Sequence, residues 1–132
     1  AEELLRPTRI YVRPVLSLLR KVTILGMAHI TGGGITGNVP RSLPDGVTAV
    51  VDRSTWDVPP VFRTICAAAR LPDGEAFRTF NMGIGMVLML RPVDADRAVA
   101  HFRRAGVPAA VIGEIRKGRR RKPDVIFSGA ER

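Results

Sequence analysis

The sequence predicts an α/β (α+β) domain with a mixed β-sheet covered by helices. Short apolar runs typical of strands alternate with amphipathic runs typical of helices, and two long connections rich in glycine and proline interrupt them. The chain has 132 residues, of which 45% are hydrophobic, which is enough for one domain with a sizeable core. Because we find no internal repeat and no linker, we expect residues 1–132 to form a single domain.

The first half of the chain alternates strand and helix signals. Residues 8–12 are β-branched and aromatic, which predicts a strand. Pro14 suits a first helical turn, and the apolar positions that follow it up to Val22 predict a helix. Residues 24–31 form a second extended apolar run, and residues 47–52 predict a third strand.

The pattern continues in the second half. A proline pair opens a predicted helix at residues 59–69, and residues 74–80 fit a short helix. Residues 86–90 are continuously apolar, which predicts a central strand covered on both faces. Residues 94–104 predict a helix, and Gly106 is placed as its C-terminal stop.

A basic segment separates the last two predicted strands, at residues 109–115 and 125–127. Residues 116–122 hold six of the 21 Lys and Arg residues, which outnumber the 12 Asp and Glu residues of the chain. Gly118 and Pro123 favour turns, so we expect a solvated hairpin loop here. The alternative function is a non-catalytic basic module that binds nucleic acid through this loop.

Composition and cysteine content bear on the compartment. No apolar run approaches the ~20 residues that a membrane-spanning helix needs. The first residues do not resemble a secretory signal, and Cys66 is the single cysteine, so it cannot form an internal disulfide. We therefore expect a cytoplasmic protein, and we interpret Cys66 as a core thiol.

Residues 29–41 are the most informative stretch of the chain. Four glycines fall within six positions there, and a row of bare backbone N–H groups can hold an anion. Polar side chains flank the glycines at His29, Thr31, Thr36, Asn38 and Arg41. The segment predicts a phosphate-binding loop, and the competing interpretation is a tight structural turn against a neighbouring strand.

Two known phosphate-binding patterns nearly fit this stretch. Residues 32–37 have the G-x-G-x-x-G spacing of dinucleotide-binding proteins, and Asp52 lies where an acidic residue that binds ribose is expected. Pro40 and Pro44 leave no room for the long helix that must follow. The same glycines open a P-loop pattern, but Asn38 stands where the lysine is required. We exclude both patterns.

A second unusual run covers residues 78–86. Two glycines, Gly83 and Gly85, lead into the predicted strand at 86–90, and Asn81 offers an amide. The run is typical either of a helix end followed by a bulged strand entry, or of a second wall of the site formed by the glycine-rich stretch.

Four motifs occur together in this chain, at residues 7–12, 28–34, 38–41 and 78–86. In this order they resemble the C-terminal domain of the phosphoribosylformylglycinamidine cyclo-ligases, the aminoimidazole ribonucleotide synthetases of purine biosynthesis. The resemblance runs from about Leu4 to Ile115 and favours this family over its kinase-like relatives, such as selenide water dikinase. Arg13 and Phe77 stand where the family often has lysine and tyrosine, and the basic segment is not a family hallmark.

The resemblance implies an ATP-dependent ligase that closes the ring of formylglycinamidine ribonucleotide to give aminoimidazole ribonucleotide. ATP activates the formamide oxygen as a phosphate ester, the amidine nitrogen attacks that carbon, and phosphate leaves. Such chemistry depends on anion stabilisation and orientation. The family's N-terminal domain, which carries much of the ATP and Mg²⁺ site and the main dimer contact, is absent here. We therefore expect a fragment that is inactive alone and that belongs to a homodimeric enzyme when full length.

The candidate site residues follow from the two unusual runs. The catalytic candidates are His29, as a proton donor or an ordinary structural histidine, and Asn81, as an amide lining the cleft. The candidates for binding substrate or phosphate are Thr31, Gly32, Gly33, Gly34, Asn38, Arg41, Gly83 and Gly85. We predict no metal ligands, because turn and capping roles are commoner for Asp52 and Asp57.

Overall fold

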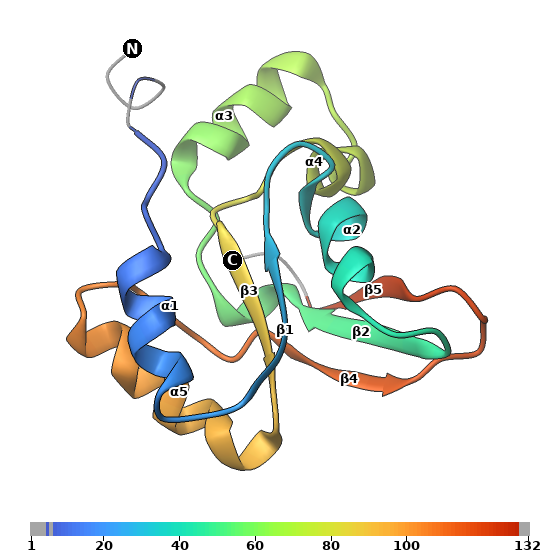
Figure 1. The fold of residues 1–132 in the computed structure, drawn as a ribbon. Helices are drawn as coiled ribbons and strands as arrows, with labels where there is room; N and C mark the ends of the chain where they lie inside the picture. The colour runs from blue at the N-terminus through green and yellow to red at the C-terminus, as the bar shows by residue number, and fades with distance from the viewer. Residues whose placement is uncertain (1–4, 6, 130–132) are drawn as a thin grey trace.

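A computed structural model of the chain describes residue 5 and residues 7–129. The helices are α1 (Val12–Leu19), α2 (Gly34–Asn38), α3 (Pro60–Ala69), α4 (Asp73–Thr79) and α5 (Pro92–Arg104). The strands are β1 (Ile24–His29), β2 (Val47–Asp52), β3 (Met86–Leu90), β4 (Gly113–Lys117) and β5 (Asp124–Ser128), and short 3-10 turns form at η2 (Val39–Ser42) and η3 (Arg53–Thr55). The predicted α+β class is confirmed (Figure 1).

The strands form two sheets. β1 and β3 pair antiparallel, and β2 lies between β4, which is antiparallel to it, and β5, which is parallel. The prediction of a mixed sheet is therefore confirmed for β4-β2-β5, whereas a central position for β3 is wrong, because β3 pairs only with β1 in the described chain. Both faces of β3 are covered as predicted. Val87 and Met89 pack into one hydrophobic cluster, and Leu88 and Leu90 pack into another.

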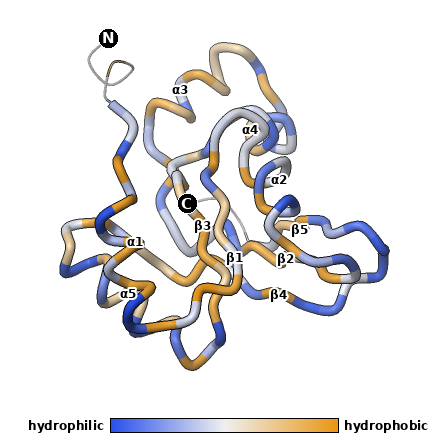
Figure 2. The backbone as a smooth tube through the Cα atoms, viewed as in Figure 1, coloured by the Kyte–Doolittle hydropathy of each residue, from blue (hydrophilic) through white to orange (hydrophobic). Residues whose placement is uncertain are grey.

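Three hydrophobic clusters hold these layers together. The first lies between the two sheets and includes Ala28, Ile30, Ala49 and Val51. The second joins α1 and α5 to the other face of the β1–β3 pair, and Figures 1 and 2 show these two helices on one side of that pair. The third packs α3 and α4 around the fully buried Phe77. The segments that hold the candidate site therefore lie where the first and third clusters meet.

Two predicted strand segments are wrong. Residues 8–11 form no strand, and α1 already begins at Val12 with Pro14 in its first turn, where a missing N–H costs no hydrogen bond. No described strand lies beside residues 8–11, so their alternating pattern finds no partner. Residues 109–112 also lie outside the strand, since β4 begins at Gly113, opposite Val51 near the end of β2.

The basic segment does not form the predicted hairpin. β4 and β5 lie on opposite sides of β2, so residues 118–123 must cross the end of β2 instead of joining adjacent strands. Two backbone hydrogen bonds fix this crossing, from Gly118 N to Gly46 O (2.8 Å) and from Gly46 N to Arg121 O (2.7 Å).

The predicted stop of α5 at Gly106 is confirmed, because Gly106 has a φ of +72° and Val107 N donates to Phe102 O.

Within the residues that the structure describes, no helix is both long and apolar enough to cross a lipid bilayer.

Candidate functional site

The glycine-rich stretch is a tight turn that leads from β1 into the single-turn helix α2. Gly33 and Gly34 both have left-handed backbone conformations, with φ of +96° and +57°, which favour glycine. Gly34 N donates to Thr31 O at 3.0 Å, and Gly37 N donates to Gly33 O at 2.8 Å. Two of the backbone N–H groups in this stretch are therefore used within the turn itself.

Asn38 holds the turn in shape from inside. Its side chain is buried, and Nδ2 donates to the carbonyl oxygens of Gly34 (2.9 Å), Gly32 (3.2 Å) and Thr31 (3.4 Å). These bonds link three carbonyl oxygens of the compact turn to one buried side chain. The structure thus gives Asn38 a role in shaping the turn, and its contact with a ligand stays a prediction.

Residues 31–38 and the second unusual run lie together. A Cβ at Gly34 would lie 2.1 Å from Phe77 O and 2.7 Å from Phe80 O, so only glycine lets α2 approach α4 this closely. Thr36 Oγ1 reaches Phe77 O at 3.5 Å, and Ile30 N donates to Gly85 O at 2.9 Å. The two runs that the sequence singled out are neighbours in the fold.

The glycines of the two runs differ in what surrounds them. Gly83 and Gly85 are packed against protein: a Cβ would lie 2.5 Å from Pro59 Cδ at Gly83 and 2.1 Å from the Tyr11 hydroxyl at Gly85. Gly32 and Gly37 have no atom within 4 Å of such a Cβ and no left-handed φ. Internal packing therefore explains why Gly34, Gly83 and Gly85 are glycines. It does not explain Gly32 and Gly37.

Asn81 forms a side-chain turn at the start of the second run. Its Oδ1 accepts from Gly83 N at 3.0 Å, and its backbone oxygen accepts from Ile84 N at 2.9 Å. The indole nitrogen of Trp56 donates to Met82 O at 3.0 Å, which fixes the same turn from the other side. These bonds hold residues 81–84 in one conformation beside α4.

His29 lies at the end of β1, exposed and opposite Met86 of β3. Its ring contacts Tyr11 edge to face, with centroids 6.2 Å apart. Tyr11 was not predicted as a site residue, because the pattern of residues 8–12 predicted a strand and gave Tyr11 no chemical role. The available signal was that Tyr11 and Gly85 both belong to motifs of the resembled family.

Two arginines stand on the elements that flank α2. Arg41 lies in η2 and Arg78 in α4, and both elements pack against α2. Both side chains are exposed, and neither has an ion pair or a side-chain hydrogen bond with another described residue. The two elements packed against α2 therefore each carry a positive charge that no described carboxylate pairs with.

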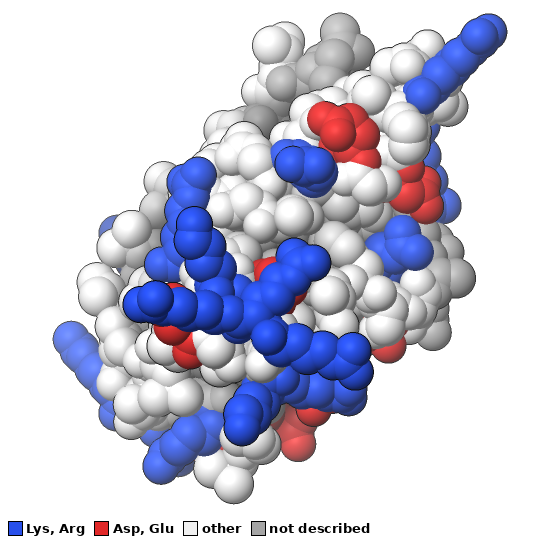
Figure 3. All heavy atoms as spheres, turned by 90° about the vertical axis from the view of Figure 1, so that its right-hand side faces the viewer, with Lys and Arg blue, Asp and Glu red and all other residues white. Residues whose placement is uncertain are grey.

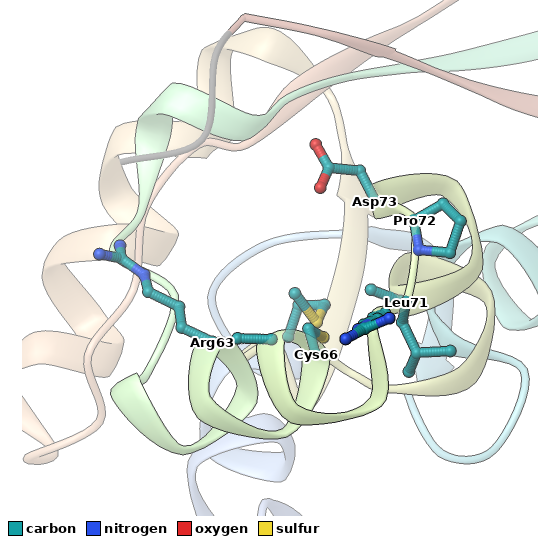
Figure 4. Close-up of a pocket in the computed structure, with 9 residues that line it drawn as sticks. Arg63, Cys66, Leu71, Pro72 and Asp73 are labelled. Carbon is teal, nitrogen blue, oxygen red and sulfur yellow. The ribbon is translucent and has the colours of Figure 1, made fainter.

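Two surface hollows were found away from this surface. One, of about 490 Å³, lies between α3 and α4 and is lined by Arg63, Cys66, Arg70 and Asp73, among others (Figure 4). The other, of about 680 Å³, lies between the start of α1 and the end of α5. None of the predicted site residues lines either hollow. Among these residues Thr31, Gly32 and Arg41 are exposed, whereas Gly34 and Asn38 are buried.

Lys and Arg side chains gather on the side of the molecule that carries β2, β4 and β5 (Figure 3). Arg116 pairs with Glu114, and Arg121 Nε lies 3.4 Å from Asp45 Oδ2. All five residues of β4 are exposed, so the basic segment continues an exposed edge strand. Charged residues on such an edge discourage pairing with another chain.

The carboxylates of the described chain do not gather into a metal site. No group of three or more His, Cys, Asp or Glu side chains in residues 7–129 could hold a metal ion. Asp52 instead accepts from Ser54 N (2.9 Å) and Ser54 Oγ (2.7 Å), which is the capping role expected for it.

Residues 1–126 match the family model described as "AIR synthase related protein, C-terminal domain". The chain is 50% identical over 117 residues to the phosphoribosylformylglycinamidine cyclo-ligase of Caldicellulosiruptor saccharolyticus, which covers 89% of this chain and 34% of that protein. It is 51% identical over 116 residues to the protein of the same name from Cupriavidus metallidurans, with 88% and 33% covered. The chain thus spans about a third of the length of these relatives.

Proposed function

The chain belongs to the AIR synthase related protein C-terminal domain family, and from that membership we propose that it is the substrate-side domain of a phosphoribosylformylglycinamidine cyclo-ligase. In this proposal the complete enzyme uses ATP to close the imidazole ring of aminoimidazole ribonucleotide. This domain supplies one wall of the site, and the remainder of the enzyme supplies most of the ATP and Mg²⁺ contacts. The chain is then inactive alone.

The observation that carries the proposal is the pair of open glycines. Gly32 and Gly37 have ordinary backbone conformations and empty space where a side chain would stand, so the fold itself does not require glycine there. A surface bare of side chains lets a ligand oxygen approach the backbone closely. Arg41 and Arg78 stand on the two elements that pack against α2, and in this proposal their charges attract a phosphate group to it.

The proposed reaction transfers the γ-phosphoryl group of ATP to the formamide oxygen and releases ADP. The amidine nitrogen then attacks the activated carbon, the C–O bond breaks, and phosphate leaves with that oxygen. A proton leaves the attacking nitrogen. Each step develops charge on phosphate oxygens, so fixed donors and cations lower the barrier more than a strong base does.

The candidate residues that the packing does not already explain can then be given roles. Thr31 and Arg41 bind a phosphate group beside the open backbone of Gly32 and Gly37. Asn81, whose Oδ1 is used in its own turn, offers its Nδ2 to the substrate. His29 is exposed at the rim and takes or gives the proton of the attacking nitrogen.

A chimeric enzyme tests this proposal, in which the matching third of the Caldicellulosiruptor saccharolyticus protein is replaced by this chain. In that enzyme we compare Gly37→Leu with the matched control Gly74→Leu, since both glycines are helical and both face open space. We expect Gly37→Leu to lower kcat/KM for ring closure by about tenfold or more, or 1.4 kcal/mol, and Gly74→Leu to leave it unchanged. Equal effects of the two variants would remove the open glycines from the site.

A further inference from the structure

Large exposed hydrophobic side chains are concentrated in one part of the described chain. Most of them fall before residue 28: Leu5, Ile10, Val12, Leu16, Leu19, Leu25 and Met27, each between 43% and 82% exposed. The others, such as Val93 and Val111, are scattered over separate elements. Single exposed apolar residues are normal on a protein surface, but a gathering of this kind marks a surface that another body covers.

The first part of this surface is an apolar stripe along α1. Val12, Leu16 and Leu19 are spaced i, i+4 and i+7, so they lie on one line along the helix. Val15 and Leu18 lie on the neighbouring line and are buried against α5. The apolar face of α1 is therefore wider than the part that the domain itself covers.

The second part is one half of a sheet face. Met27 stands directly opposite Leu88 in the antiparallel pair, so both side chains lie on the same face of the sheet. Leu88 is packed into the cluster formed by α1 and α5, whereas Met27 is 45% exposed. Leu25, at the irregularity in the register between Ile24 and Gly26, is 64% exposed. The helices thus cover the β3 half of this face and Ile24 at the start of β1, and leave Leu25 and Met27 open.

The elements that carry these two parts are linked at both ends. α1 and β1 are joined at one end by residues 20–23, and at the other end the Tyr11 ring contacts His29. Residues 8–11, just before α1, have the pattern of a strand but no strand beside them. We call residues 8–12 together with Leu16, Leu19, Leu25 and Met27 the N-terminal apolar face.

We infer that the N-terminal apolar face is the docking surface for the remainder of the cyclo-ligase, and that residues 8–10, which precede the N-cap of α1, add as a strand to a sheet edge of that partner. The lengths of the relatives identify the partner. This chain spans only about a third of the relatives it matches, so about two thirds of such an enzyme has to be placed against it. Strand addition pairs the backbone of residues 8–10, whereas Tyr11 O already accepts from Val15 N. The inference rests on the family membership that supports the proposed function.

Footprinting tests this inference in the chimeric enzyme described above, with the isolated chain as its reference. Amide hydrogen exchange is measured at residues 8–12, and oxidation by hydrogen peroxide at Met27. We expect both to slow by about tenfold or more in the chimera, because the partner covers these groups. Amide hydrogen exchange near Val93 and Val111, whose exposed side chains do not belong to this face, should be the same in both proteins. Equal labelling of the N-terminal apolar face in the two proteins would overturn the inference.

A two-polypeptide experiment checks the occupant and uses matched variants. The chain is mixed with the first two thirds of the same relative, and the complex is measured by light scattering. We expect Leu16→Ser with Leu25→Ser to weaken association at least tenfold, and Val93→Ser with Val111→Ser to leave it unchanged. All four residues are exposed, so circular dichroism should show folded chains throughout. A homodimer of the isolated chain that the first pair of substitutions dissolves would assign the face to a second copy and overturn the inference.

The outcomes separate this inference from the proposed function. A chimera that protects the N-terminal apolar face but does not close the ring contradicts the function and supports the docking surface. A chimera that closes the ring without protecting this face supports the function and contradicts the docking surface.

Discussion

Individual glycines in this domain serve two different purposes within the same motifs. Gly34, Gly83 and Gly85 make room for neighbouring parts of the protein, whereas Gly32 and Gly37 face open space. The sequence shows where glycines gather but not what lies against each one. The two unusual runs could therefore be picked out from the sequence, but which of their glycines are required by packing became clear only from the structure.

Gly34 should not tolerate alanine. Its φ of +57° disfavours a side chain, and a Cβ would lie 2.1 Å from Phe77 O. We expect Gly34→Ala to lower the free energy of unfolding by about 3 kcal/mol or more, measured by urea denaturation. In the same helix, Gly37→Ala should be neutral or stabilise the domain by up to about 1 kcal/mol, because its space is empty. Similar losses in both variants would contradict the packing described here.

Asn38 should be required as an amide. Its Nδ2 donates to three carbonyl oxygens, and its side chain is buried. Asn38→Asp keeps the shape but replaces the donor by an acceptor facing other acceptors, so we expect a loss of about 2–3 kcal/mol in thermal or urea unfolding at neutral pH. An aspartate variant as stable as the parent protein would show that the turn does not depend on these bonds.

At the scale of elements, local sequence patterns predicted the features that depend on neighbouring residues, namely where strands and helices begin and end. The bounds of β2 and β3 agree with the apolar runs at residues 47–52 and 86–90, and Gly106 ends α5 as expected. Pairing could not be predicted in the same way. Strand partners depend on contacts between distant segments, so the division into two sheets, the wrong hairpin at residues 116–122 and the unpaired residues 8–11 all followed from tertiary structure.

The contact between α1 and the start of β3 can be tested by a double-mutant cycle. A Cβ at Gly85 would lie 2.1 Å from the Tyr11 hydroxyl oxygen and 3.1 Å from its ring carbon Cζ. We expect Gly85→Ala to cost about 2 kcal/mol of unfolding free energy in the parent chain, and clearly less in Tyr11→Phe, which lacks that oxygen. Additive effects of the two substitutions would place Tyr11 away from Gly85.

As a whole, the chain spans about a third of the length of the relatives it matches. None of its predicted site residues lines either hollow, and most of its large exposed apolar side chains fall before residue 28. Both features suit a domain that completes its site and covers its surface against another domain. The basic side around β4 takes no part in the proposed site. It consists of an edge strand and a crossing loop that are distant in sequence from the site residues.

Neutralising the basic loop should leave catalysis intact. We expect the triple variant Arg119→Gln, Arg120→Gln, Arg121→Gln of the chimeric enzyme to keep its kcat/KM within about twofold, which is below 0.5 kcal/mol. The parent chain should not bind duplex DNA or RNA measurably at physiological salt, tested by fluorescence anisotropy. Binding that falls steeply with salt and disappears in the triple variant would favour the alternative of a nucleic-acid module.

The most direct test of the central claim is the rate of ring closure by the isolated chain and by the chimeric enzyme, each supplied with ATP, Mg²⁺ and formylglycinamidine ribonucleotide. We expect the chimera to form aminoimidazole ribonucleotide, and the isolated chain to form none above background. A chimera that is folded but inactive, or an isolated chain that turns over on its own, would contradict the central claim.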